Sequence, residues 1–325
     1  MPAKAEPEQT VSIASVEQST GIARATLRIW ERRYGFPQPG RDARGERTYP
    51  DDQVRKLRLV AALLARGHRP GRLVPLGTEQ LEALAAPAGA NGEGTARSPA
   101  TDVPMLAALR RHDTAAVLGL LEQGIRQRGL AGFVTECMAP LNVDVGLAWS
   151  RGELEVFEEH LYSECAQHVL RAHLARVSEP PVRGPRVLLA TFPDEAHGLG
   201  LLMAQALLVL EGCPCTSLGV RVPVQQIAAA SRAFGADVVG LSFTASVNPA
   251  HVLRGLEQLR GALAPQVQVW AGGRSPVLAR HRIAGVQPVP DVGDIPGHVA
   301  AWRAAQGRAT AGVDAALSPA LPSGG

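Results

Sequence analysis

Apolar residues recur at helical spacing in the first half of the chain and gather into short continuous runs in the second half. Before residue 78 the pattern predicts a helix that begins near Val11, a second helix over 25–34 and a third over 51–66. A Gly- and Arg-rich stretch over 38–49 predicts a hairpin between the last two. Between 104 and 178 the pattern predicts four more helices, over 105–111, 113–128, 130–149 and 154–177, as in a four-helix bundle.

The second half alternates apolar strands with helices. Strands are predicted over 187–190, 215–220, 238–242, 267–271 and 286–289, with helices over 198–210, 224–234, 249–263 and 296–305. Such an alternation indicates a doubly wound parallel α/β sheet of the Rossmann or flavodoxin-like kind. Ligands of these folds bind at the carboxyl ends of the strands.

The remaining segments have the composition of linkers and tails. Residues 78–103 are rich in Ala, Gly, Pro, Glu and Ser and predict a flexible linker. Residues 1–10 and 306–325 are predicted to be disordered. The expected organisation is an N-terminal helical domain over 11–77, the linker, a helical bundle over 104–178 and a Rossmann-like domain over 183–305.

Charge is distributed unevenly along the 325 residues, whose formal net charge is only +3. Residues 22–72 contain thirteen basic and five acidic residues, a net +8, so the rest of the chain carries about −5. An Arg-rich surface on a small domain is typical of nucleic-acid binding. No apolar run approaches the ~18 residues of a membrane span, and the N-terminus does not resemble a secretory signal. We therefore expect a cytoplasmic protein with no membrane partner.

The second predicted helix carries the residues that would read DNA. In a helix-turn-helix, the first residues of the second helix reach base edges in the major groove. Here these are Arg24, Thr26 and Arg28, while Leu27 and Trp30 face the core. Residues 26–35 and the arginines and tyrosine that follow resemble the winged helix-turn-helix of MerR-type transcription regulators. The resemblance implies an all-α domain with a small wing that binds double-stranded operator DNA, with further contacts from Tyr34, Arg41, Arg47 and Tyr49.

A histidine follows the first predicted strand of the second half, in the stretch Asp194-Glu195-Ala196-His197-Gly198-Leu199-Gly200. An imidazole in a strand-to-helix loop can ligate a metal at the ligand-binding edge of the sheet. After Gly200, 41 residues precede Ser242-Phe243-Thr244, and 27 more precede Gly272-Gly273. These elements resemble the cobalamin-binding pattern D-x-H-x-x-G, S-x-L, G-G of base-off, His-on B12 domains.

This resemblance assigns roles to each element. It implies that His197 is the lower axial cobalt ligand and that Glu195, which replaces the usual Asp, holds its tautomer. Gly198 and Gly200 let the backbone approach a bulky group. The nucleotide tail of the cobalamin would lie in a slot lined by Ser242, Thr244, Gly272 and Gly273.

The predicted bundle contains a third signal. Nine residues separate Trp149 from Glu159-His160. This spacing resembles the W-x9-E-H motif of adenosylcobalamin-dependent photoreceptor repressors of the CarH/LitR type, in which the three residues pack over the upper face of the corrin. Where light-sensing relatives can carry a second cobalt-capturing histidine, this chain has Ser150, so His160, His168 or water are the alternatives for the illuminated state.

Together the resemblances imply a light-responsive repressor rather than an enzyme. Adenosylcobalamin would promote a tetramer, a dimer of dimers, that binds operator DNA in the dark, and light would release it. One alternative is a MerR-type regulator that uses a different tetrapyrrole, a bilin or haem, or another cobalamin such as methylcobalamin or hydroxocobalamin. Another is a corrinoid carrier subunit of a methyltransferase, which the N-terminal helix-turn-helix argues against.

Overall fold

The computed structural model describes residues 10–65, 68–85, 99–177, 182–244 and 247–317. The chain divides into two compact units. The first comprises residues 1–169 with 243–252 and 274–281, and the second comprises 170–242, 253–273 and 282–325. The first unit contains an N-terminal domain, here called the head (residues 10–85), and all but the last residues of a helical domain, here called the helical cap (residues 99–174).

Five helices and a small sheet form the head: α1 (Ile13–Thr20), α2 (Arg24–Tyr34), α3 (Asp51–Ala65), α4 (Pro70–Leu73) and α5 (Thr78–Ala85). The side chain of Ser12 accepts a hydrogen bond from the backbone N–H of Ser15 and so begins α1, and Gly21 ends it in the left-handed conformation. The antiparallel strands β1 (Thr10–Ser12), β3 (Arg47–Pro50) and β2 (Gly40–Arg41) lie in the order β1-β3-β2. The core contains Leu27 and Trp30, as predicted.

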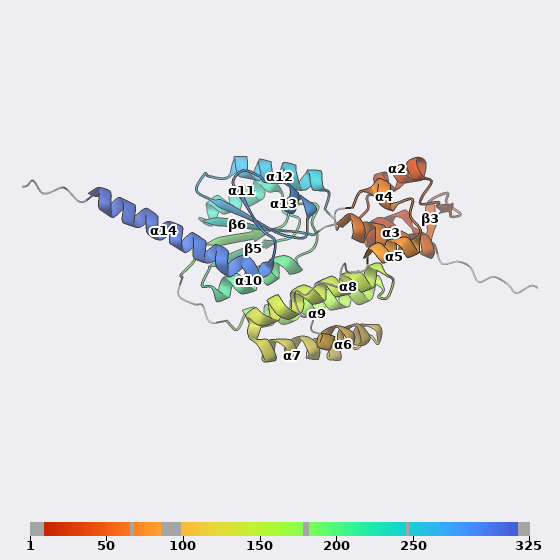
Figure 1. The fold of residues 1–325 in the computed structure, drawn as a ribbon, viewed down its shortest axis with the longest axis horizontal. Coiled ribbons are helices and arrows are strands. Elements are labelled where there is room, and N and C mark those ends of the chain that lie inside the picture. The colour runs from red at the N-terminus through yellow and green to blue at the C-terminus, as the bar shows by residue number, and fades with distance from the viewer. Residues whose placement is uncertain (1–9, 66–67, 86–98, 178–181, 245–246, 318–325) are drawn as a thin grey trace, which may run out of the picture. The chain divides into compact units, whose positions relative to one another are not determined.

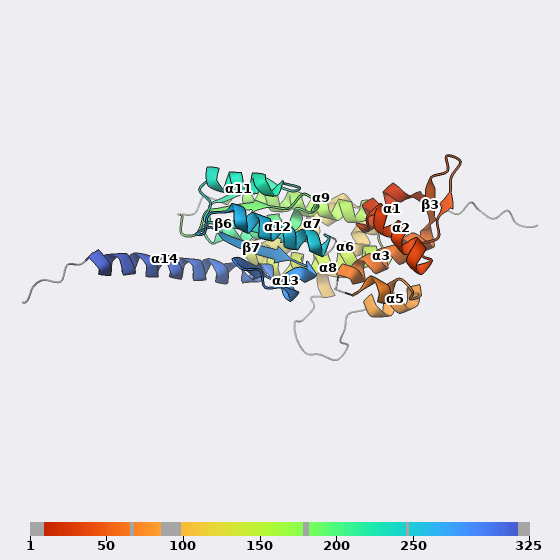
Figure 2. The same ribbon diagram turned by 90° about the horizontal axis from the view of Figure 1, so that it is seen from above.

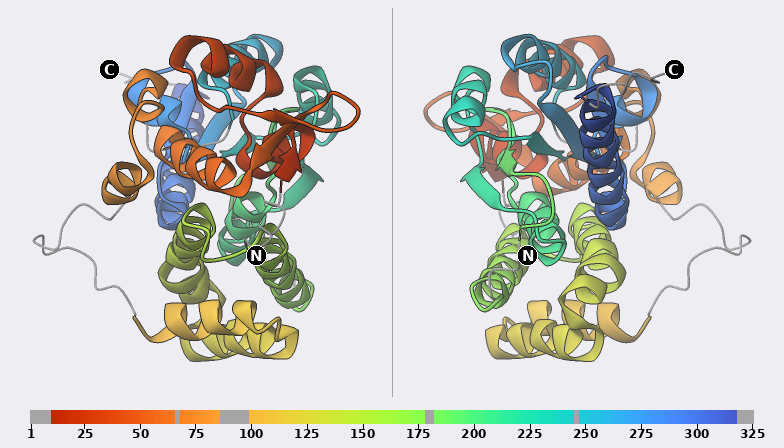
Figure 3. Two further views of the ribbon diagram at one scale, coloured as in Figure 1. Left: turned by 90° about the vertical axis from the view of Figure 1, so that its right-hand side faces the viewer. Right: turned by 90° about the vertical axis from the view of Figure 1, so that its left-hand side faces the viewer.

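Four helical stretches form the cap, as the periodicity predicts. Helices α6 (Pro99–Arg110) and α7 (Thr114–Gly132) pack together, and a π-helical turn (Phe133–Met138) leads into α8 (Ala139–Ser150), which is followed by α9 (Val156–Leu174). Gly129 has φ 69° and ψ 171°, which are not helical values, so the chain breaks there inside α7. Figure 3 shows the yellow helices α6 and α7 beneath the green helices α8 and α9.

Five strands form the sheet of the second domain: β4 (Val187–Ala190), β5 (Cys215–Gly219), β6 (Val238–Phe243), β7 (Gln268–Gly273) and β8 (Val286–Val289). Their order is β5-β4-β6-β7-β8, and β4 is parallel to both β5 and β6. This is the flavodoxin-like order, in which the direction of winding reverses between β4 and β6. The ligand-binding crevice of such a sheet opens at that reversal.

Helices cover both faces of the sheet. Figure 1 shows α11 (Val224–Ala233) and α12 (Pro249–Ala262) on one face, and α10 (Leu199–Leu210) with the first part of α14 (Ile295–Leu317) on the other. A short helix, α13 (Pro276–Arg280), lies between β7 and β8. Among the described residues, no helix is long and apolar enough to cross a membrane.

The predictions for the linker and the tail are wrong at three boundaries. The linker was predicted to begin at residue 78, but Thr78–Ala85 forms α5, whose Leu81 is buried in the core of the head. Helix α6 already begins at Pro99, and residues 86–98 lie outside the described part of the chain. The disordered tail was predicted from residue 306, but α14 continues to Leu317 (Figure 2). Residues 1–9 and 318–325 also lie outside the described part.

Candidate functional site

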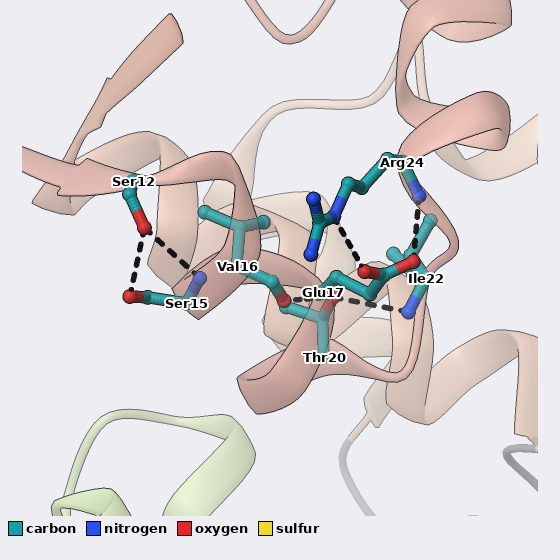
Figure 4. A network of polar contacts seen from close by, with 7 residues as sticks. All are labelled: Ser12, Ser15, Val16, Glu17, Thr20, Ile22 and Arg24. Atoms are coloured by element: carbon teal, nitrogen blue, oxygen red, sulfur yellow. Dashed lines mark hydrogen bonds and ion pairs between the residues drawn. The ribbon is translucent and has the colours of Figure 1, made fainter. Parts of the chain in front are cut away.

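Arg24, the first residue of α2, is held in place by the preceding helix. Its Nε donates to Oε2 of Glu17 at 2.7 Å, and its backbone N–H donates to Oε1 of the same carboxylate at 3.1 Å. These hydrogen bonds lower the pKa of Glu17. The turn between the helices is fixed by Thr20, whose hydroxyl donates to the carbonyl of Val16 and accepts from the N–H of Ile22 (Figure 4). Glu17 and Thr20 therefore fix the start of the predicted recognition helix.

Glu31 joins that helix to the hairpin. One carboxylate oxygen accepts from Nε of Arg47 at 3.1 Å and the other accepts from the hydroxyl of Tyr49 at 3.0 Å. Tyr49 is fully buried, and this burial raises the pKa of its hydroxyl above the ordinary value. The prediction that Tyr49 contacts DNA directly does not fit this structure, because its side chain lies in the core and its hydroxyl is bonded to Glu31. Its role here is to fix the position of the hairpin against α2.

Most of the exposed arginines in the described part of the head lie on α2 and the hairpin. Arg28 on α2 and Arg41 on β2 are exposed, Thr26 and Tyr34 are half-buried, and Nη1 of Arg41 donates to the carbonyl of Gly45. Arg44, at the tip of the hairpin, is also exposed but was not among the predicted DNA contacts, although a basic residue in a predicted turn is a signal for one. The turn is built by Asp42, which accepts from the N–H of Arg44 at 2.9 Å. Arg44 is thereby placed to reach a phosphate.

The loop after β4 builds a histidine site on a buried carboxylate. The side chain of Glu195 is only 1% exposed, whereas that of His197 is 61% exposed. Oε1 of Glu195 accepts from Nδ1 of His197 at 2.6 Å and from its backbone N–H at 2.9 Å. The loop itself is fixed by buried Thr191, whose hydroxyl donates to the carbonyl of Glu195 at 2.7 Å. Because Nδ1 faces the carboxylate, a metal would be ligated through Nε2, the arrangement typical of metal-bound histidines.

Close approaches between neighbouring segments occur near the carboxyl ends of β4, β6 and β7. Gly198 caps the N-terminus of α10, and a Cβ atom on Gly200 would lie 2.5 Å from Oγ of Ser242. A Cβ atom on Gly272 would lie 3.2 Å from the carbonyl oxygen of Val289. A side chain at Gly200 would therefore clash with Ser242, and one at Gly272 would require the backbone at Val289 to shift slightly.

Residues just beyond the strand ends add polar groups. Thr244 follows the last residue of β6, and the backbone N–H of Arg274, directly after Gly273, donates to the carbonyl of Phe243 at 2.8 Å. Ser275 is buried, and its Oγ makes no hydrogen bond to the described residues. A buried polar atom of this kind is satisfied by water or a ligand. An exposed imidazole oriented by a buried carboxylate and an unsatisfied hydroxyl beyond the strand ends fit a corrinoid with an extended tail.

In the helical cap, Glu159 orients His160. Its Oε2 accepts from Nδ1 of His160 at 2.7 Å, and its Oε1 accepts from the hydroxyl of Ser163 at 2.7 Å. His160 is exposed and Trp149, in the last turn of α8, is half-buried. Ser150 is fully buried, and its hydroxyl donates to the carbonyl of Leu147 at 2.8 Å.

None of the four cysteine side chains is exposed. Cys137, Cys165 and Cys213 are buried and Cys215 is half-buried. Burial raises the pKa of Cys213 to about 11 and that of Cys215 to about 12, so both are protonated near neutral pH. This weighs against a bilin bound through a thioether, one of the alternatives for the tetrapyrrole.

Three family models match separate parts of the chain. Residues 11–73 match the MerR HTH family of regulatory proteins, and residues 104–173 and 185–297 each match a B12 binding domain family. The chain thus combines a MerR-type DNA-binding domain with cobalamin-binding domains, and it is a transcription regulator, not an enzyme.

Two curated relatives extend over most of the chain. It is 34% identical over 271 residues to the HTH-type transcriptional repressor CarH of Myxococcus xanthus, covering 82% of this chain and 89% of that protein. It is 30% identical over 265 residues to the HTH-type transcriptional repressor CarA of the same organism, covering 79% and 84%. The chain belongs to the family of these CarH- and CarA-type regulators.

A more remote likeness exists among solved structures. The monomethylamine corrinoid protein of Methanosarcina barkeri is 16% identical, covers 59% of this chain and 93% of its own, and gives a TM-score of 0.47. This likeness has no bearing on function.

Proposed function

We propose that the protein is a light-responsive repressor that binds adenosylcobalamin as its chromophore. The observation that carries the proposal is the pair formed by buried Glu195 and exposed His197, which presents an oriented imidazole at the reversal point of the sheet. The same chain carries a head with a net charge of +8 over residues 22–72. A cofactor site linked to a DNA-binding head is suited to regulating DNA binding.

The residues of the α/β domain would hold the cofactor from below. His197 would ligate cobalt through Nε2 while Glu195 fixes the ring. Ser242, Thr244, Gly272 and Gly273 would line the slot for the tail, because they lie at or just beyond the carboxyl ends of β6 and β7, the ligand-binding edge of such a sheet. Trp149, Glu159 and His160 of the cap would face the adenosyl side. When bound, the cofactor supplies a light-labile cobalt–carbon bond.

The head would bind operator DNA as a winged helix-turn-helix. Arg24, Thr26 and Arg28 on α2 would face the major groove, and the β2–β3 hairpin would act as the wing, with Arg41 and Arg47 near phosphates. A single small head binds DNA weakly, so we propose that the dark form is a tetramer, a dimer of dimers, whose linked heads bind with higher avidity. Illumination would dissociate the tetramer and release the operator.

The test is a dark and an illuminated measurement on the same sample. The purified chain is mixed separately with adenosylcobalamin, methylcobalamin and hydroxocobalamin, and absorption spectra and gel-filtration volumes are recorded before and after light. We expect a tetramer only with adenosylcobalamin in the dark. An elution volume that light leaves unchanged would refute light-controlled assembly. Spectra that show haem or bilin uptake instead would favour the second candidate, and methyl transfer would favour a carrier subunit.

A further inference from the structure

Helix α3 of the head packs against α8, the helix that carries Trp149. The side chain of Arg55 lies over the turn after α8, where a Cβ atom on Gly152 would be 3.7 Å from Cδ of Arg55. One turn further along α3, the guanidinium carbon of Arg58 lies 5.7 Å from the centroid of the Trp149 ring. A cation within about 6 Å of an indole centroid is attracted by the negative face of the ring. The head therefore contacts the cap at the tryptophan itself.

Arg58 differs from its neighbour Arg55 in its hydrogen bonding. Its Nε is buried and makes no hydrogen bond to the described residues, whereas Nη2 of Arg55 donates to Glu82 at 2.7 Å. Burying an unpaired donor is unfavourable, so the attraction to the indole offsets part of that cost. Arg55 is paired within the head, and Arg58 is the cation that α3 directs at Trp149.

The backbone beneath Trp149 is held firmly. The N–H of Gly152 donates to the carbonyl of Trp149 at 2.9 Å, and the N–H of Glu153 donates to the carbonyl of Ala148 at 2.8 Å. On the next turn, the guanidinium of Arg110 from α6 donates to both the carbonyl and the carboxylate of Glu153. With the backbone fixed, the orientation of the indole is the variable that a side-chain neighbour can set.

We infer that Arg58 is a positioning residue for the cofactor site: the DNA-binding head holds the Trp149 indole in the orientation that the upper face of the cobalamin requires. The inference rests on the proposed function, in which Trp149 packs over that face. Coupling between two sites is reciprocal. A change in the group that Trp149 contacts would therefore alter the attachment of α3, and through it the head.

Lys56 provides a matched control on the same helix. Its Nζ lies 4.1 Å from the centroid of the Phe36 ring, a cation–π contact made wholly within the head. Replacing Lys56 by Gln removes such a contact without touching the cap. Arg58→Gln removes the contact with the cap, and Arg58→Lys keeps the positive charge.

The experiment titrates the full chain with adenosylcobalamin in the dark and follows absorbance. Arg58→Gln is expected to weaken binding roughly threefold to tenfold, from the range of cation–π strengths. Arg58→Lys should restore most of the affinity, and Lys56→Gln should stay within twofold of the parent chain. In a Trp149→Ala background Arg58→Gln should have no further effect, because the two residues act through one contact.

Amide hydrogen exchange without cofactor tests the contact separately. Arg58→Gln should raise exchange over residues 146–153, and Lys56→Gln should not. Faster exchange with unchanged cobalamin affinity would overturn the positioning role and leave a purely structural contact. Unchanged exchange and unchanged affinity would overturn the contact as well. If the parent chain does not bind adenosylcobalamin, the proposed function is refuted, and the positioning role with it. The exchange data would still test whether Arg58 contacts Trp149, because they are recorded without cofactor.

Discussion

Replacing Glu195 by Gln tests the lower half of the cofactor site with the least change of shape. The carboxylate is buried and accepts two hydrogen bonds from His197, one from the backbone and one from Nδ1. Gln keeps the size of the side chain and one acceptor oxygen but loses the charge. The ring would then be held by a neutral hydrogen bond, about half as strong as a charge-assisted one.

The size of the effect follows from that difference. A hydrogen bond to a charged group contributes about 1.5–3 kcal/mol and a neutral one about 0.5–1.5 kcal/mol. The loss is therefore about 1–2 kcal/mol, or roughly fivefold to thirtyfold in cobalamin affinity. This range overlaps the loss of affinity, roughly tenfold to hundredfold, that typically follows removal of the hydrogen-bond partner of a metal-binding histidine. The free energy of unfolding without cofactor should fall little, because a buried carboxylate is costly to desolvate.

The assay is an absorbance titration with adenosylcobalamin, combined with electron paramagnetic resonance of the Co(II) form, in which an axial nitrogen splits the cobalt lines. We expect Glu195→Gln to weaken binding with His197 still ligating in part, and His197→Ala to abolish the nitrogen splitting. Asp194→Asn, at the exposed neighbouring carboxylate, is the control and should bind as the parent chain does. Parent-like affinity and splitting in Glu195→Gln would show that the carboxylate does not orient the ligand.

Three further predictions follow from contacts in the structure. Gly200→Ala should weaken cobalamin binding, because its Cβ atom would lie 2.5 Å from Oγ of Ser242, and adding Ser242→Ala should recover part of the loss in the same titration; no recovery would mean that the close approach is irrelevant. Arg44→Ala should make the plot of log affinity against log salt less steep by about 1, as expected when one phosphate contact is lost. The DNA for this measurement is an operator selected from random duplexes. A slope of unchanged steepness would remove Arg44 from the interface. Cys213 and Cys215 should resist iodoacetamide at pH 8 until the chain is unfolded, because their raised pKa values keep them protonated, and rapid labelling of the folded chain would contradict their burial.

Sequence patterns predicted the sheet and the position of His197 in the loop after β4, because the determinants are local. Buried parallel strands read as continuous apolar runs, and the residues of the site lie at the ends of β4, β6 and β7, where the alternation of strand and helix places them. Close backbone approach also has a sequence signature, since Gly200 and Gly272 stand where a Cβ atom would meet a neighbour.

Features that depend on tertiary packing were missed. Residues 78–85 have the composition of a linker, and only the burial of Leu81 against the core of the head reveals a helix. Tyr49 looks like a surface residue of a wing, but β3 directs it inward, where its hydroxyl meets Glu31. The contact of Arg58 with Trp149 joins residues from different domains, and neither side chain shows a sequence signal for it.

The construction of the head bears on how the cofactor would control DNA binding. Arg24 is fixed by Glu17 and the hairpin is fixed through Glu31, so the groups that would face DNA are held in place by contacts inside the head. A preorganised reading surface leaves little for the cofactor to change within it. Control would then act on how many heads reach one operator and how they are oriented. A tetramer that links several heads raises their effective concentration at the operator, so its loss would release DNA while each head stays folded. Head–cap contacts such as Arg58 with Trp149 are where such control would enter.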